Sequence, residues 1–140
     1  MKFQLKKEIL YKKELKAEEM LKAIQIYRDI YADYLIQIKY RRIDWGKMNT
    51  EYLKNKFGGL KEQMAINLYL YFPNLEDKYH KYALSSQDFN DKFSEVVKKG
   101  KIEKNDIPEI IRMYKTYLKK DGQFTSSIVK YIRQQSNTLL

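Results

Sequence analysis

The chain has 140 residues, of which 44% are hydrophobic and 33% are charged, and its formal net charge at pH 7 is +10. This length and composition suit a single domain over residues 1–140 and exclude a wholly disordered chain. There is no cysteine, which excludes disulfides, thiol nucleophiles and cysteine-based metal sites. A reducing cytoplasm fits this composition, and we expect the protein there.

The N-terminal segment predicts one long helix over about residues 4–45, because no Gly or Pro precedes Gly46. Apolar residues within it follow the alternating three- and four-residue spacing of a helix that packs on other helices. They are Ala17, Met20, Ile24, Tyr27, Tyr31, Tyr34 and Ile38. Nearer the N-terminus, Lys6 and Lys13 fall on the same stripe. We therefore expect residues 1–16 either to overhang the bundle or to pair with a second copy of the chain, as a homodimer.

The three tyrosines of this stripe raise a question, because basic residues lie among and after them. Aromatic and basic side chains together are typical of surfaces that stack nucleic-acid bases. Here Tyr27, Tyr31 and Tyr34 share their helix face with Met20 and Ile38. The pattern therefore favours packing in the core or at an interface over base stacking.

Four or five shorter helices are predicted to pack on the long one. The first carries Leu53 and Phe57, is interrupted at Gly58-Gly59 and stops before Pro73. The others are predicted from their capping signals, such as Ser85 with Asp88, Asp106 as an N-cap, and Gly100 and Gly122 as closing residues. Their expected ranges are 75–84, 85–100, 105–122 and 124–140. No strand pattern competes, so the predicted fold class is an all-α helical bundle.

Lysine makes up 23 of the 28 basic residues. Residue types with AT-rich codons are abundant throughout, so part of the charge would follow from the AT-rich genome of a bacterium or phage. The lysines near two predicted helix ends are the candidate contacts for an acidic partner protein or for phosphate groups. They are Lys98, Lys99, Lys101, Lys104, Lys115, Lys119 and Lys120. Cations also stabilise helix C-termini, so a purely structural role is the alternative.

Catalytic and metal-binding patterns are missing from the sequence. His80 is the single histidine, and it lies three residues after Asp77. Di-iron bundles use this spacing twice together with further glutamates, which one histidine cannot supply. No nucleotide-binding or hydrolase motif occurs. We therefore expect no enzymatic activity, no metal and no cofactor.

The function that these observations favour is non-catalytic protein–protein interaction, as an adaptor, inhibitor or assembly component. The alternative is a nucleic-acid-binding bundle that uses the lysine-rich helix ends. A third interpretation is a peripheral membrane helix at residues 2–16, which are basic with a few apolar side chains. No stretch is apolar enough to predict a transmembrane segment.

Overall fold

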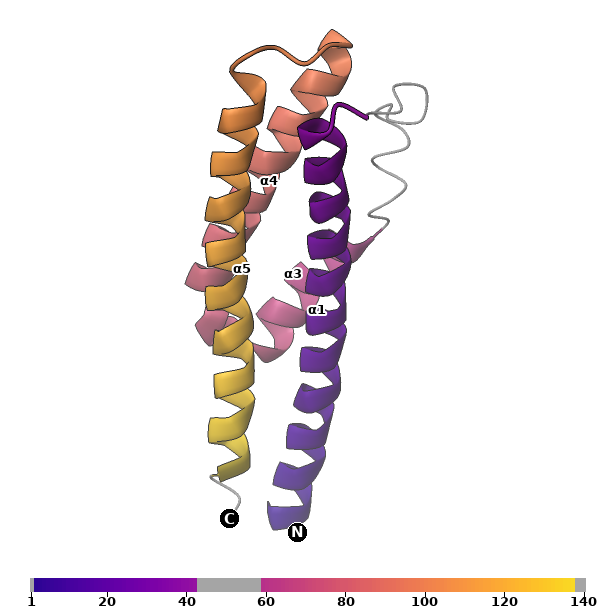
Figure 1. Ribbon diagram of the computed structural model, residues 1–140. Helices are drawn as coiled ribbons and strands as arrows, with labels where there is room; N and C mark the ends of the chain where they lie inside the picture. Colours follow the sequence, from indigo (N-terminus) through magenta and orange to yellow (C-terminus); the bar gives the residue numbers. More distant parts are fainter. Residues whose placement is uncertain (1, 43–58, 138–140) are drawn as a thin grey trace.

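The computed structural model describes residues 2–42 and 59–137, whose regular secondary structure is helical with no strand (Figure 1). The elements are α1 (Lys2–Lys39), α3 (Leu60–Tyr71), the short 3₁₀ turn η1 (Pro73–Leu75), α4 (Glu76–Lys99) and α5 (Asp106–Asn137). The predicted all-α fold with a long N-terminal helix is confirmed. The described part holds three shorter α-helices rather than four or five, because two pairs of predicted helices are continuous.

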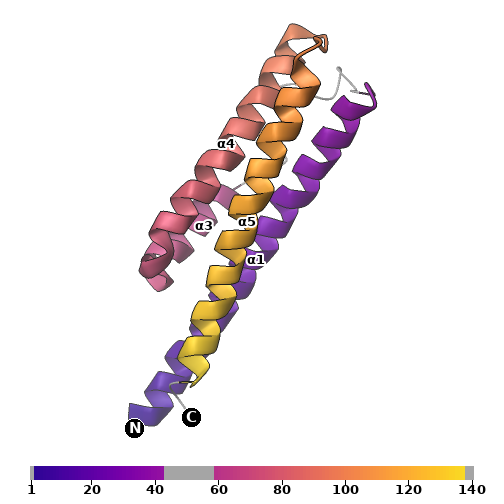
Figure 2. The ribbon, with the colours of Figure 1, turned by 60° about the vertical axis from the view of Figure 1, so that its left-hand side comes forward.

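The helices form an elongated bundle in which α1 and α5 run antiparallel, side by side (Figures 1 and 2). A tight corner joins α4 to α5, and these two helices pack as an antiparallel hairpin. The shorter α3 packs on α1. The N-terminal end of α1 and the C-terminal end of α5 therefore lie at the same end of the molecule (Figure 1).

Helix α1 ends earlier than predicted, at Lys39 instead of about residue 45. Arg41 adopts a left-handed conformation with φ of 54°. The N–H of Arg41 donates to Ile38 O, and the N–H of Arg42 donates to Gln37 O. This pair of bonds is the Schellman arrangement that closes helices, usually with glycine at the left-handed position. The predicted boundary at Gly46 lies outside the described residues.

The core is unusually rich in aromatic side chains, and it confirms the predicted packing of the tyrosine stripe. Tyr27, Tyr31 and Tyr34 are buried. Tyr31 lies against Phe89 and Tyr117, with ring centroids 4.8 and 4.9 Å apart. Rings from α1, α4 and α5 thus meet at the centre, and their large apolar area stabilises the bundle.

The predicted boundary between residues 84 and 85 is wrong, because α4 continues through it. Ser85 does not cap a helix; its hydroxyl is buried and donates to Tyr82 O at 2.8 Å. Buried residues recur at three- and four-residue spacing on both sides of the expected break. They include Tyr79, Tyr82, Ser86, Phe89, Phe93 and Val96. Burying this face outweighs a local capping signal of about 1 kcal/mol. The predicted end at Gly100 is confirmed, with φ of 69°.

Helix α5 likewise continues through Gly122, where a break was predicted. A glycine inside a helix costs about 1 kcal/mol relative to alanine. Burial of Phe124 and Ile128 beyond it contributes more than this amount. Asp106 is the first residue of α5, and its carboxylate accepts a hydrogen bond from Glu103 N–H upstream, at 2.7 Å. The helix start is therefore near the predicted one, with a different role for the Asp106 side chain.

The first turns of α1 are solvent-exposed where their side chains are described, and Ala17 is the first buried residue. Helix α5 nevertheless reaches this part of α1, since Lys13 Nζ donates to Tyr131 Oη at 3.0 Å.

Helix α3 begins at Leu60, after Gly59. The predicted helical positions Leu53 and Phe57 lie outside the described residues. Within the described residues, no helix combines the length and hydropathy that a membrane span requires.

Candidate functional site

An ion cluster ties α4 to α5 at the corner between them. Lys92 Nζ lies 3.1 Å from Asp106 Oδ1 and 3.2 Å from Glu109 Oε2. Lys99 Nζ lies 2.9 Å from Asp106 Oδ2. Lys92 and Asp106 are both buried. Buried charges are retained only where they are paired and hydrogen-bonded, so the role of this cluster is to hold the corner of the hairpin.

The pKa of Asp106 reflects two opposing influences. Burial by itself would raise this pKa, but the hydrogen bond from Glu103 N–H and the two neighbouring ammonium groups lower it to about 2. For Lys92, burial lowers the pKa, and the carboxylates that accept its hydrogen bonds raise it well above the ordinary lysine value. Asp106 and Lys92 are therefore both charged at neutral pH.

Replacing Asp106 by Asn should lower the free energy of unfolding by about 1–2 kcal/mol at pH 7, allowing for partial screening by solvent. Because the pKa of Asp106 is lower in the folded than in the unfolded chain, its stabilisation is complete above about pH 5. It disappears as the pH falls toward 2. Denaturant titrations of the wild type and Asp106→Asn at several pH values should therefore converge at low pH. Asp88→Asn, at an exposed position of α4, is the control. A gap that stays constant from pH 7 to pH 2 would contradict the expectation.

The structure separates the seven lysines named as candidate contacts. Lys99 belongs to the corner cluster. Lys98 is exposed beside a shallow hollow that Asp91 and Glu95 also line. Lys101 and Lys104 are exposed in the loop after α4. The remaining three lie on α5, where Lys115 and Lys119 are exposed and Lys120 is half-buried. The seven lysines therefore do not form one site.

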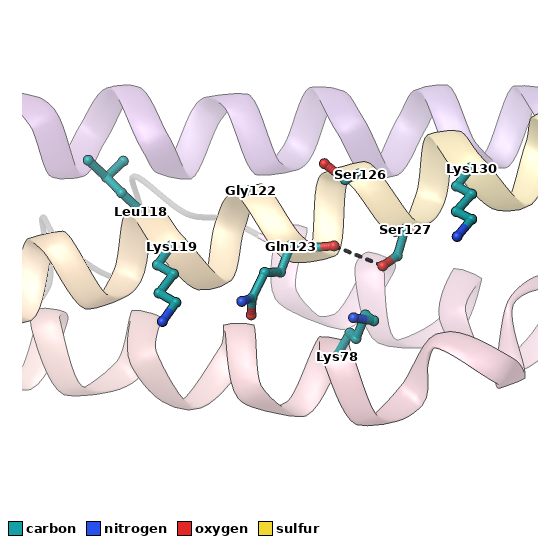
Figure 3. Close-up of a pocket in the computed structure, with 8 residues that line it drawn as sticks. All are labelled: Lys78, Leu118, Lys119, Gly122, Gln123, Ser126, Ser127 and Lys130. Atoms are coloured by element: carbon teal, nitrogen blue, oxygen red, sulfur yellow. Dashed lines mark hydrogen bonds between the residues drawn. The ribbon is translucent and has the colours of Figure 1, made fainter.

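An open groove of about 510 Å³ runs along α5, beside α4. Figure 3 shows Lys119, Gln123, Ser127 and Lys130 along α5, with Lys78 opposite them on α4. Ser127 Oγ donates to Gln123 O at 2.8 Å, which holds the hydroxyl beside the groove. No carboxylate is among the lining residues. The groove thus presents three ammonium groups together with the side-chain amide of Gln123, a donor set that suits an anion.

Lys78 and Lys130 were not among the candidate residues, although a signal for Lys130 is present in the sequence. Lys119 and Lys130 are eleven residues apart, which is three helical turns, so they share a face only if one helix contains both. The break predicted at Gly122 concealed this relationship. No comparable pattern links Lys78 to them, since its place depends on how α4 packs against α5.

A polar seam crosses the aromatic core. Asp121 on α5 is buried and accepts hydrogen bonds from Nε and Nη2 of Arg28 on α1. The hydroxyls of Tyr31 and Ser86 share a hydrogen bond of 2.8 Å. Burial raises the pKa of Tyr27 to about 12 and raises that of Tyr31 and Tyr82 further. These tyrosines are therefore neutral at pH 7, and the seam provides specific pairing inside the bundle.

Among the described residues, His80 is not part of a group of side chains that could bind a metal ion. Its imidazole Nε2 lies 3.3 Å from Glu76 Oε1, and both side chains are exposed. Asp77 instead pairs with Lys81 at 3.2 Å. Among the described residues, no group of three or more His, Cys, Asp and Glu is arranged to hold a metal ion.

The outer face of α3 carries large apolar side chains in contact with solvent. Ile66, Tyr69 and Leu70 are 57, 52 and 68% exposed. Their spacing of three and four residues places them next to one another on the helix surface. The opposite face of α3 buries Met64 and Leu68 against the bundle. Helix α3 thus carries apolar side chains on both faces, and the described residues cover only one of them.

In comparisons with known proteins, no family model, curated protein or solved structure matches the chain. The candidate sites are therefore the groove on α5 and the outer face of α3, and both are defined by their geometry alone.

Proposed function

We propose that the protein is a non-catalytic protein–protein interaction protein, such as an adaptor, inhibitor or assembly component, and that a partner protein binds the outer face of α3. The observation that carries this proposal is the exposed apolar triplet of Ile66, Tyr69 and Leu70. Contiguous exposed apolar side chains are typical of interaction sites, whereas single ones are common on any surface. Tyrosine is also enriched among residues that dominate binding energy.

Cations from α1 lie on the other side of α3, where it packs on the bundle. Lys12 and Lys16 of α1 lie over the ring of Tyr71 on α3, with their Nζ atoms 5.8 and 5.9 Å from its centroid. Tyr71 is rotated by about 140° around α3 from Ile66, so these cations do not border the exposed triplet, and the apolar side chains of the triplet define the chemistry of the partner. The apolar stripe of an amphipathic helix has this chemistry, because helices commonly bind through residues spaced three and four apart.

The proposal can be tested by photo-crosslinking in the native host. Benzoylphenylalanine would replace Tyr69 on α3 and, as a control, the exposed Tyr11 on α1. We expect one protein other than this chain to crosslink at position 69 and not at position 11. Crosslinking to a second copy of the chain would favour a homodimer instead. Crosslinks to the same proteins at both positions would contradict a specific α3 site.

Binding of the purified partner would then be measured by calorimetry. Leu70→Asp should weaken the affinity roughly 30-fold or more, as expected for a residue at the centre of an interface. Leu84→Asp introduces the same change at an exposed position of α4 and should leave the affinity nearly unchanged. Both substitutions are on the surface and should alter the free energy of unfolding by less than about 1 kcal/mol. Equal affinities for the two variants would exclude the α3 face.

A further inference from the structure

The groove on α5 is part of a longer row of basic side chains, which we call the α5 basic stripe. It consists of Arg112, Lys115, Lys119, Lys130 and Arg133, all exposed on α5. The separations between them are three, four, eleven and three residues, which are close to whole helical turns. The five cations therefore lie in one line along the outer face of α5, over about 32 Å at 1.5 Å per residue.

The positive charge of this stripe is not neutralised by ion pairs with the described residues. None of its five cations makes an ion pair with another residue of the part of the chain that the structure describes. The acidic residues of α5 form ion pairs with cations outside the stripe. Asp106 and Glu109 pair with Lys92, and Asp121 pairs with Arg28. Lys78 adds a sixth cation from α4 (Figure 3). Stability therefore does not account for this concentration of positive charge.

The side chains between the cations are small or polar. Thr116, Gln123, Ser126 and Ser127 lie between Lys115 and Lys130, and Leu118 is the one large apolar residue that lines the groove. A protein-binding surface needs aromatic or aliphatic anchors and is depleted in lysine. By contrast, Lys, Arg, Ser, Thr and Gln are the residue types that contact nucleic-acid phosphates. The composition of the stripe therefore favours a phosphate backbone over an acidic protein.

We propose that the α5 basic stripe binds the sugar–phosphate backbone of a nucleic-acid duplex without reading its base sequence. No aromatic side chain lines the groove, so it lacks the platform on which single-stranded bases stack. The length of the stripe, about 32 Å, is close to one turn of a B-form duplex, 34–36 Å. This inference goes beyond the proposed protein interaction and would make the protein a link between a partner on α3 and a nucleic acid on α5.

The test is fluorescence anisotropy of the full chain with 20-base-pair mixed-sequence duplexes of DNA and RNA, at 50 and 200 mM salt. If all five cations neutralise phosphates, the affinity for DNA should fall roughly 500-fold between these concentrations, a slope of about −4.5 in log salt. Lys119→Gln with Lys130→Gln should weaken binding at 50 mM salt and should make the slope shallower by about 1.8. Comparing the two duplexes shows which type of nucleic acid is preferred.

The matched control is Lys22→Gln with Lys61→Gln, which removes the same net charge from exposed positions on α1 and α3. Its slope should equal that of the wild type. Equal slopes for the two double variants would overturn the proposal, as would tighter binding to single strands or strong preference for one duplex sequence. Failure to bind either duplex while binding polyglutamate would assign the stripe to an acidic protein instead. Circular dichroism of each variant confirms that its fold is retained, because glutamine and lysine have similar helix propensities.

Discussion

Replacing Arg28 with Met is expected to lower the free energy of unfolding by about 3 kcal/mol or more, since it leaves a buried charge without its partner. The Asp121 side chain is only 3% exposed, and both of its oxygens accept hydrogen bonds from Arg28. Among the described residues, the one further hydrogen bond to this carboxylate comes from Thr125 Oγ1, at 3.4 Å. A hydroxyl at that distance cannot replace a guanidinium group, so the substitution would leave the carboxylate poorly compensated.

Substituting the other member of the pair, Asp121→Leu, should lower the free energy of unfolding by only about 1 kcal/mol, because Arg28 has other interactions available. The Arg28 side chain is 34% exposed, and its Nη1 donates to Gln25 Oε1 at 2.9 Å. Chemical denaturation of both single variants and of the double variant would measure the coupling. We expect the double variant to be more stable than Arg28→Met alone. A larger loss for Asp121→Leu than for Arg28→Met would contradict this description of the pair.

The second large effect is expected for Phe93→Ala, which should lower the free energy of unfolding by about 3–5 kcal/mol. Phe93 is fully buried, and its ring stacks on Tyr34 with centroids 4.0 Å apart and an interplanar angle of 4°. The substitution removes this contact between α4 and α1 and leaves a cavity in a closely packed interior.

Tyr69→Ala on α3 provides the matched control, because it also removes one aromatic ring, from a side chain that is 52% exposed. Its expected effect on the free energy of unfolding is about 0.5 kcal/mol. Thermal and denaturant unfolding of both variants should therefore differ clearly. Similar losses for the two would mean that the ring of Phe93 contributes no more to stability than a surface ring.

The proposed binding surfaces lie on different helices, so their roles can be separated experimentally. Substitutions at Leu70 should affect the protein partner and leave the salt dependence of nucleic-acid binding unchanged. Substitutions at Lys119 and Lys130 should have the opposite effect. Failure of one proposal therefore leaves the other open to its own test.

Much of the fold was predictable from the sequence, because helical periodicity is a local property of the chain. The stripe from Ala17 to Ile38 predicted both the long helix and the face that it buries. Gly100 was recognisable as a helix end because its left-handed conformation suits glycine. The all-α class followed from the same spacing patterns and from the scarcity of turn residues.

Only the tertiary structure decided where the later helices are continuous. A helix start at Ser85 would gain about 1 kcal/mol from its capping signal. Keeping Gly122 inside a helix costs about 1 kcal/mol relative to alanine. The buried rings and aliphatic side chains on both sides of these positions contribute more, and their burial depends on partners far along the chain. Local sequence signals therefore predict helix ends at these two positions, although packing against distant residues keeps each helix continuous.

Tertiary structure also determines which charged residues are buried in ion pairs and which are exposed, a difference that the sequence does not show. Arg28 and Asp121 are 93 residues apart, yet they form a buried pair. Lys99 is held by Asp106 at the corner of the hairpin, whereas Lys115 and Lys119 face solvent and form no ion pair with the part of the chain that the structure describes. The sequence determined that the protein is basic and helical. Which cations stabilise the fold and which remain available to a partner depends on the packing of α1, α4 and α5, because charges separated along the chain meet only there.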